Sequence, residues 1–132
     1  MSEEVLKIFS DGAAKGNPGP ASIGASLIND GHEVASISQE IGIATNNVAE
    51  YKALEAALVK ALELGYKNVS INADSELMIK QLKGEYKVKN SDLKVIYNSI
   101  TTLLNKFDSK TLQHIPRDEN KRADQLANLA FN

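Results

Sequence analysis

An aspartate separates an apolar segment from a turn rich in glycine and proline near the start of the sequence. The segment is Val5–Phe9, and Asp11-Gly12 and then Gly16-Asn17-Pro18-Gly19-Pro20 follow it. β-Branched and aromatic residues are typical of a strand, and glycine and proline end one. Open α/β sheets bind their ligands at the carboxyl ends of strands. Asp11 therefore stands at a candidate site, although a common Asp-Gly turn would explain the same residues.

The length of 132 residues predicts one domain, over residues 1–132, with a single apolar core. The absence of cysteine excludes disulfides, thiol chemistry and cysteine-based metal sites. The opening residues MSEEVLKIF have neither the basic nor the apolar region of a signal peptide, and no later segment is long enough to span a membrane. We therefore expect a soluble, cytoplasmic protein that does not bind membranes.

Turn signals and apolar periodicity predict an α/β fold. The expected strands are 5–11, 21–28, 34–41, 68–74 and 110–115, and the expected helices run from Thr45-Asn46-Asn47 to Gly65, from Ser75 to Gly84, from Asp92 to about Phe107, and beyond Asn120. A hairpin signal at Asn29-Asp30-Gly31-His32 makes the first three strands antiparallel. Strand-helix-strand crossovers follow, so we expect a mixed sheet with helices on both faces.

Four carboxylates fall at the starts or ends of these elements: Asp11, Glu50, Asp74 and Asp124. Asp11 and Asp74 would lie side by side if a right-handed crossover makes their strands neighbours. Clustered carboxylates repel one another, by about 4 kcal/mol for two charges roughly 4 Å apart at an effective dielectric of 20. Divalent cations relieve this repulsion, and oxygen ligands favour Mg²⁺ or Mn²⁺ over zinc. Jointly the four acids indicate a metal site.

Each of these acids also has a structural explanation. Glu50 follows Asn47 at the spacing of a capping box, in which a carboxylate binds a free backbone N–H. Asp74 stands where it could help to cap the next helix, and Asp124 could be a solvated acid near Lys121. The sequence pattern alone leaves both explanations open.

Across nearly its whole length the chain resembles type 1 ribonuclease H. The motifs that carry the resemblance are DGAAKGNPGP at 11–20, TNNVAE at 45–50, ADS at 73–75 and NKRADQLAN at 120–128. The resemblance implies a five-stranded mixed sheet and hydrolysis of the RNA strand of RNA/DNA hybrids, leaving 5′-phosphate and 3′-hydroxyl ends. It also implies that Asp11, Glu50, Asp74 and Asp124 hold two Mg²⁺ ions, for which Mn²⁺ could substitute.

The resemblance further implies that Asn17, Asn46, Asn47 and the backbone around Gly12 contact the hybrid across its minor groove. This is where the 2′-hydroxyl groups of RNA are exposed. No aromatic patch indicates a protein partner, so we expect a monomer whose partner is the nucleic acid.

The chain departs from the family's better-known members in the loop before the last helix. Those members carry a histidine in a mobile loop, which assists metal exchange or product release. Here the loop is short, and His114 precedes Ile115-Pro116, so we expect it in the strand, packed or hydrogen-bonded in place. A functional role is the alternative, because His114 lies ten residues before Asp124, the spacing expected of that histidine. The chain looks like a short-loop branch in which the arginine matching Arg117 takes the auxiliary role. A plain surface position remains the alternative for Arg117.

A second departure lies between Lys83 and Asn90, where some relatives insert a longer basic protrusion that grips DNA. Lys83, Lys87 and Lys89 remain here, in a chain with a net charge of −2. Fewer phosphate contacts predict weaker binding and a shallower dependence on salt.

Three functions stay open on these grounds. The first is an active ribonuclease H, and the second is a weakly active or inactive nucleic-acid-binding relative on the same fold. The third is another nuclease of this fold, such as a junction resolvase or a reverse-transcriptase-associated domain. The complete acidic set favours the enzyme, since a scaffold has no use for four mutually repelling carboxylates.

Overall fold

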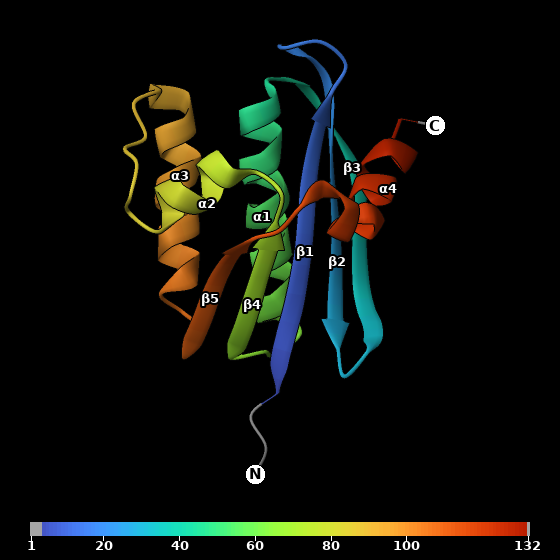
Figure 1. Ribbon diagram of the computed structural model, residues 1–132, viewed down its shortest axis with the longest axis vertical. Helices are drawn as coiled ribbons and strands as arrows, with labels where there is room; N and C mark the ends of the chain where they lie inside the picture. Colours follow the sequence, from blue (N-terminus) through green and yellow to red (C-terminus); the bar gives the residue numbers. More distant parts are fainter. Residues whose placement is uncertain (1–3, 132) are drawn as a thin grey trace.

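A five-stranded mixed sheet forms the centre of the computed structural model, which describes residues 4–131. The strands are β1 (Val5–Ala14), β2 (Gly19–Asn29), β3 (His32–Ala44), β4 (Asn68–Ala73) and β5 (Ser109–His114). Their order across the sheet is β3-β2-β1-β4-β5 (Figure 1). β1 pairs antiparallel with β2, and β2 with β3, whereas β4 lies parallel to both β1 and β5. The predicted mixed sheet, with its first three strands antiparallel, is confirmed.

Helices cover both faces of this sheet. They are α1 (Asn46–Glu63), α2 (Glu76–Leu82), α3 (Ser91–Leu104) and α4 (Lys121–Leu129), with a 3-10 turn, η1 (Arg117–Glu119), before α4. A Cβ atom on Gly12 would meet the backbone of α1, and one on Gly24 would meet the backbone of α4. Gly12 pairs with Ile23, the neighbour of Gly24, and successive residues of a strand point to opposite faces. α1 and α4 therefore pack on opposite faces, as Figure 1 shows.

The apolar core lies between the sheet and the helices α1 and α3. Its largest fully buried residues come from β1, β2, β4 and the helices α1, α2 and α3, and include Leu6, Ile8, Leu54, Leu58, Ile71 and Ile100. Each side chain of this size stabilises the fold by about 1.5–3 kcal/mol through removal of apolar surface from water. Because β1, β4 and α1 all contribute side chains to this core, packing fixes their relative positions.

β1 extends three residues beyond the predicted end at Asp11. Gly12, Ala13 and Ala14 continue to pair with β2, up to the pair of Ala14 with Ala21. The Asp-Gly sequence is therefore not the turn that it resembles. Gly12 is required for another reason, because a Cβ atom there would lie 2.3 Å from the carbonyl carbon of Ala49 in α1. Only a residue without a side chain lets α1 approach β1 this closely.

Other predicted boundaries differ by a few residues. β2 and β3 are longer than expected because their pairing continues to Gly19 and Ala44. α3 ends at Leu104, and Phe107 is buried in the turn that follows. The predicted stop at Gly65 is confirmed, since this glycine has a φ of 87° directly after the C-cap of α1.

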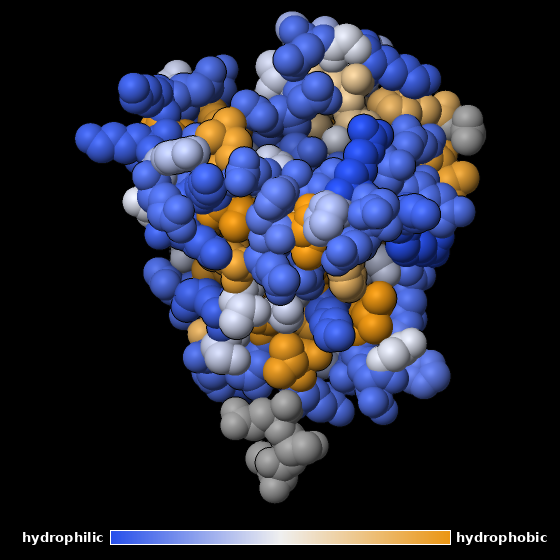
Figure 2. All heavy atoms as spheres, viewed as in Figure 1, coloured by the Kyte–Doolittle hydropathy of each residue, from blue (hydrophilic) through white to orange (hydrophobic). Residues whose placement is uncertain are grey.

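The surface is mostly polar in the view of Figure 2, where apolar residues form small, separated groups. Within residues 4–131, no helix combines the length and the apolar character that crossing a bilayer requires.

Candidate metal centre

Asp11 and Asp74 lie side by side because β1 and β4 are parallel neighbours. The last residues paired between these strands are Ser10 and Ala73. Asp11 is the next residue of β1 and Asp74 directly follows β4, so both carboxylates stand beside the carboxyl end of β4. The crossover through α1 that the sequence predicted connects β3 to β4. This part of the predicted geometry follows directly from the strand order.

Glu50 reaches the same place from α1. The capping-box explanation for it is wrong, because the N-cap of α1 is Thr45, whose Oγ1 accepts a hydrogen bond from the backbone N–H of Val48 at 3.2 Å. Asn47 is already inside the helix, and Glu50 lies beyond the free N–H groups of the first turn. One of its carboxylate oxygens, Oε2, is buried without a hydrogen-bond partner. Helix capping therefore does not account for this acid.

The carboxylates of Asp11, Glu50 and Asp74 each offer a ligand atom, and these atoms all lie within 4.8 Å of one another. Asp11 is 7% exposed, so little solvent screens its charge. An all-oxygen set of this spacing suits hard divalent cations. The buried Glu50 oxygen is also the kind of group that a cation would satisfy. The three residues are therefore compatible with binding of a divalent metal ion.

The electrostatics of the cluster are unfavourable without a cation. Burial raises the pKa of Asp11 from 3.8 to about 7, and the negative charge of Asp74 adds to the effect. Burial likewise raises the pKa of Glu50 from 4.5 to about 9, together with the charges of Asp11 and Asp74. A folded state in which acids hold their protons more tightly than in the unfolded chain is destabilised as those protons are lost.

We expect the stability of the metal-free protein to fall as pH rises. The unfolded chain loses these protons near pH 4, whereas the folded protein retains them to about pH 7 at Asp11 and about pH 9 at Glu50. The folded state binds more protons throughout this window, so the free energy of unfolding decreases across it. Urea denaturation in EDTA, from about pH 5 to about pH 9, measures the decline. Mg²⁺ should flatten it, and a stability in EDTA that rises across this window would contradict the prediction.

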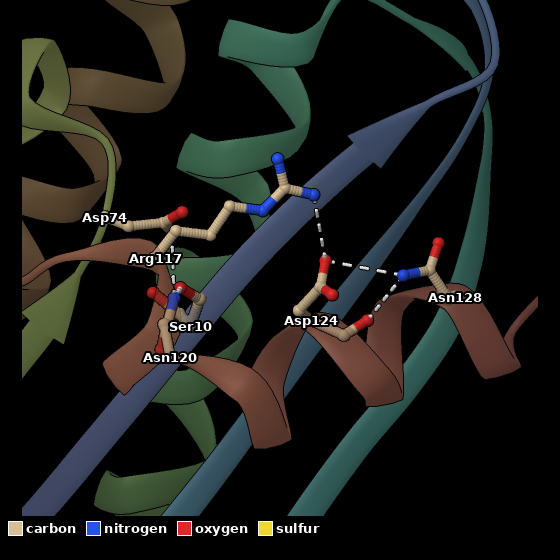
Figure 3. Close-up of polar contacts among 6 residues, drawn as sticks. All are labelled: Ser10, Asp74, Arg117, Asn120, Asp124 and Asn128. Carbon is tan, nitrogen blue, oxygen red and sulfur yellow. Dashed lines mark hydrogen bonds and ion pairs between the residues drawn. The ribbon is translucent and has the colours of Figure 1, made fainter.

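Asp11, Glu50 and Asp74 line a cleft on the protein surface. Asp124, from α4, lines this cleft as well but does not belong to the group of three. Its Oδ1 lies 3.8 Å from Nη2 of Arg117, whose side chain is 81% exposed (Figure 3). Nδ2 of Asn128 also donates to this oxygen, at 3.3 Å. Neither contact involves Lys121, which the sequence placed beside Asp124. Arg117 is the one cationic residue lining the cleft in the described part of the chain.

Asp74 does not cap α2, which was the structural explanation for it. Ser75 caps that helix instead, because its Oγ accepts from the backbone N–H of Met78. Asp74 accepts a hydrogen bond at 2.9 Å from Nδ2 of Asn120, a residue that the sequence reasoning did not single out. The sequence signals for Asn120 were its place as the first residue of the motif NKRADQLAN and its position one helical turn before Asp124, where an asparagine is typical of an ordinary N-cap.

The residues predicted to bind substrate divide between two adjoining clefts. Gly12 and Asn46 line the cleft of the carboxylates, together with Asn128. Asn17 and Asn47 line a second cleft, beside Thr45, Val48, Asn90, Asp92 and Leu93. Oδ1 of Asn17 accepts from the backbone N–H of Asn46 at 3.1 Å, so Asn17 joins the glycine-rich turn to the start of α1.

His114 lies at the end of β5, in the strand as predicted, but it is exposed. It is not among the residues that line the carboxylate cleft. The expectation that it would be packed in place is wrong, because β5 is an edge strand whose residues are mostly exposed. Lys83, Lys87 and Lys89 are also exposed, in the connection between α2 and α3.

Comparison with known proteins agrees with this geometry. A family model described as reverse transcriptase-like matches residues 9–130. A ribonuclease HI of Halobacterium salinarum is 44% identical over 124 residues, which are 93% of this chain and 62% of the relative. A bifunctional protein of Mycobacterium tuberculosis is 41% identical over 126 residues, which are 94% of this chain and 35% of the relative. The chain thus spans less than two thirds of the length of these curated relatives.

Solved structures share the whole fold. The crystal structure of RNase H1 from Halobacterium salinarum matches with a TM-score of 0.94 at 43% identity, covering 96% of this chain and 97% of that one. LC11-RNase H1, from a compost metagenome, was solved in complex with an RNA/DNA hybrid and matches with a TM-score of 0.89 at 40% identity, covering 95% of each chain. The chain therefore belongs to the reverse transcriptase-like family and, within it, to the type 1 ribonucleases H.

Proposed function

We propose that this chain is a metal-dependent endoribonuclease that hydrolyses the RNA strand of RNA/DNA hybrids, leaving 5′-phosphate and 3′-hydroxyl ends. The observation that carries the proposal is the group of three carboxylates within 4.8 Å, in a fold shared with an RNase H1 solved on such a hybrid. Nucleic acid is itself a polyanion, so it cannot approach these acids closely unless cations lie between them. A site of this charge suits a cation-dependent reaction on a phosphodiester.

Asp11, Glu50 and Asp74 would hold one divalent cation, and Asp124 would complete the ligands for a second. Mg²⁺ is the ion we propose, with Mn²⁺ as a substitute, because both accept all-oxygen ligation. When bound, such ions activate water and stabilise the leaving oxygen of a phosphodiester. The carboxylates keep these positions because β1, β4 and α1 share one packed core.

The asparagines beside the cleft would orient the hybrid. Asn46 lies in the carboxylate cleft, and Asn17 and Asn47 lie next to it, so a strand could run over both clefts. The oxygen of Asn17 accepts from Asn46, so a contact of Asn17 with a substrate oxygen would come from its Nδ2 group. Carboxamides and backbone N–H groups can bind 2′-hydroxyls, which distinguish RNA from DNA. The carboxylates would then act on the strand that carries those hydroxyls.

Cleavage of an end-labelled RNA/DNA hybrid tests the proposal directly. We expect Mg²⁺-dependent cutting of the RNA strand alone, no cutting in EDTA, and no cutting of matched duplex DNA or duplex RNA. Hybrid that is bound but left intact with both Mg²⁺ and Mn²⁺ would instead identify a nucleic-acid-binding relative without the activity. Cutting of branched DNA in place of the hybrid would indicate a junction resolvase.

Arg117 is proposed as an auxiliary residue that contacts a substrate phosphate. Its guanidinium is largely exposed and approaches Asp124 at 3.8 Å, so it is free to move to an incoming anion. We expect Arg117→Ala to lower kcat roughly tenfold, a modest effect because solvent screens an exposed charge. Steady-state kinetics measure it, and Arg117→Lys should recover part of the loss.

Lys121→Ala provides the matched control, because Lys121 is an exposed cation in the same segment that does not line the cleft. Equal losses in Arg117→Ala and Lys121→Ala would show that Arg117 contributes only to the general charge. Unchanged kinetics in Arg117→Ala would return Arg117 to a plain surface role.

A further inference from the structure

Asn120 is a buried polar residue at the start of α4, and its side chain does not cap this helix. It occupies the N-cap of α4 but makes no side-chain hydrogen bond to the first turn of that helix. Asparagine is favoured at N-caps because its side-chain oxygen accepts from those free N–H groups. Here the residue is 1% exposed, and its oxygen is buried without a partner. The carboxamide is thus turned away from the helix that it would normally cap.

The side-chain nitrogen of Asn120 makes two hydrogen bonds. Nδ2 donates to the backbone oxygen of Ser10 at 2.9 Å and to Oδ1 of Asp74 at 2.9 Å (Figure 3). A carboxamide nitrogen carries two hydrogens, so both are used. Ser10 is the residue before Asp11 on β1, and Asp74 follows β4. The N-cap side chain of α4 therefore joins β1, at the residue before Asp11, to Asp74 at the end of β4.

We infer that Asn120 is a positioning residue that fixes the carboxylate of Asp74 for metal binding. The inference rests on the proposed function, in which Asp74 is a ligand. The hydrogen bond holds one oxygen of Asp74 and so fixes the orientation of the whole carboxylate. A neutral donor does this without cancelling the negative charge that attracts a cation, whereas an arginine or lysine would cancel it. Partners that orient metal ligands in this way commonly change metal affinity 10- to 100-fold when removed.

Asn120 also relates Asp74 to Asp124. The backbone N–H of Asp124 donates to the backbone oxygen of Asn120 at 3.1 Å, which places the two residues one helical turn apart. Since the side chain of Asn120 is tied to β1 and β4, the start of α4 is tied there as well. The distance of Asp124 from the other three acids then depends on the same carboxamide.

Metal binding to the substrate-free protein tests this role apart from catalysis. We expect Asn120→Ala to weaken Mn²⁺ binding by about tenfold or more in calorimetry, and to lower kcat more than it raises KM. Asn120→Leu nearly preserves the shape of the side chain and removes the donor, so it should show the same loss if the alanine variant folds poorly. Circular dichroism establishes that each variant is folded.

Asn72 offers a matched control. It is a buried asparagine on β4, 7% exposed, whose Nδ2 donates to the backbone oxygen of Ile8 on β1 at 3.3 Å. Its other hydrogen-bond partners are the backbone oxygen and the hydroxyl of Ser70, so none of them is a carboxylate. We expect Asn72→Ala to lower the melting temperature as Asn120→Ala does but to change Mn²⁺ affinity less than about twofold. Equal losses of affinity in the two variants, or wild-type affinity in Asn120→Leu, would overturn the inference. If the wild-type protein binds Mn²⁺ but cuts no hybrid, the proposed function fails while the role of Asn120 in metal binding is still decided.

Discussion

Replacing Asp74 by asparagine is expected to reduce cleavage of the hybrid by about a thousandfold or more. A loss of this size corresponds to about 4 kcal/mol of transition-state stabilisation. The reason is that Asp74 supplies one of three clustered carboxylates, and a carboxamide oxygen is a much weaker ligand for a hard cation. The substitution keeps the shape of the side chain, and the new carboxamide oxygen can still accept from Asn120. Single-turnover cleavage with saturating enzyme measures the chemical step apart from binding.

The same substitution should stabilise the metal-free protein. At 4.8 Å, two like charges repel by about 3.5 kcal/mol at an effective dielectric of 20. Above about pH 7, where Asp11 is ionised, part of this repulsion is relieved when the charge of Asp74 is removed. We expect Asp74→Asn to raise the melting temperature in EDTA by roughly 5 °C. The gain should shrink as Mg²⁺ is added, since the ion stabilises the wild-type protein by binding its folded state.

Asp30→Asn is the control for a general effect of charge. Asp30 lies in the turn between β2 and β3, at a φ of 52°, which asparagine tolerates well. Its replacement removes one negative charge at the opposite end of the sheet and should leave cleavage unchanged. If Asp74→Asn lowers the melting temperature in EDTA, the carboxylates do not repel as proposed.

Gly12→Ala is expected to destabilise the fold by about 3 kcal/mol or more, which lowers the melting temperature by roughly 10 °C. The added methyl group would lie 2.3 Å from the carbonyl carbon of Ala49 and 2.4 Å from the backbone nitrogen of Glu50. Both atoms belong to the backbone of α1, so the helix must move as a unit. Because Glu50 moves with it, we also expect weaker metal binding in any protein that still folds.

Thermal denaturation with and without Mg²⁺ separates these two effects. Gly31→Asn is the control, since a Cβ atom at Gly31 meets no atom within 4 Å and its φ of 78° suits asparagine. The control should change the melting temperature by less than about 2 °C. A Gly12→Ala protein of wild-type stability would show that α1 can shift away from β1 at little cost.

The antiparallel pairing of the first three strands was predictable because it follows from local turn signals, whereas the meeting of Asp11 with Asp74 was predictable only if β1 and β4 are neighbours. Two short turns join the strands of the two antiparallel pairs, and a right-handed crossover through one helix allows β1 and β4 to be parallel neighbours. Two acids that follow paired residues must then lie together. The condition that β1 and β4 are neighbours is met by the observed strand order β3-β2-β1-β4-β5.

The roles of Gly12, Glu50 and Asn120 were not predictable in this way, because they depend on which elements touch. Gly12 has the sequence of a turn, but the approach of α1 is what requires it. Glu50 has the spacing of a capping box, but Thr45 begins the helix two residues earlier. Asn120 has the position of an N-cap, and only the packing of α4 on the sheet brings its side chain within hydrogen-bond distance of Ser10 and Asp74. In each case a tertiary contact overrides a sound local interpretation.

The helix α4 follows every strand of the sheet in the chain, which bears on how the protein is made. A ribosome releases β1, α1 and β4 before residues 121–129 exist, so Asp11, Glu50 and Asp74 can come together while Asn120 and Asp124 are still missing. A nascent chain at that stage also leaves Gly24 on β2 without the helix that covers it. The candidate site is therefore complete only after α4 has been synthesised. An interrupted chain would carry the carboxylates of the sheet without the helix that ties them together.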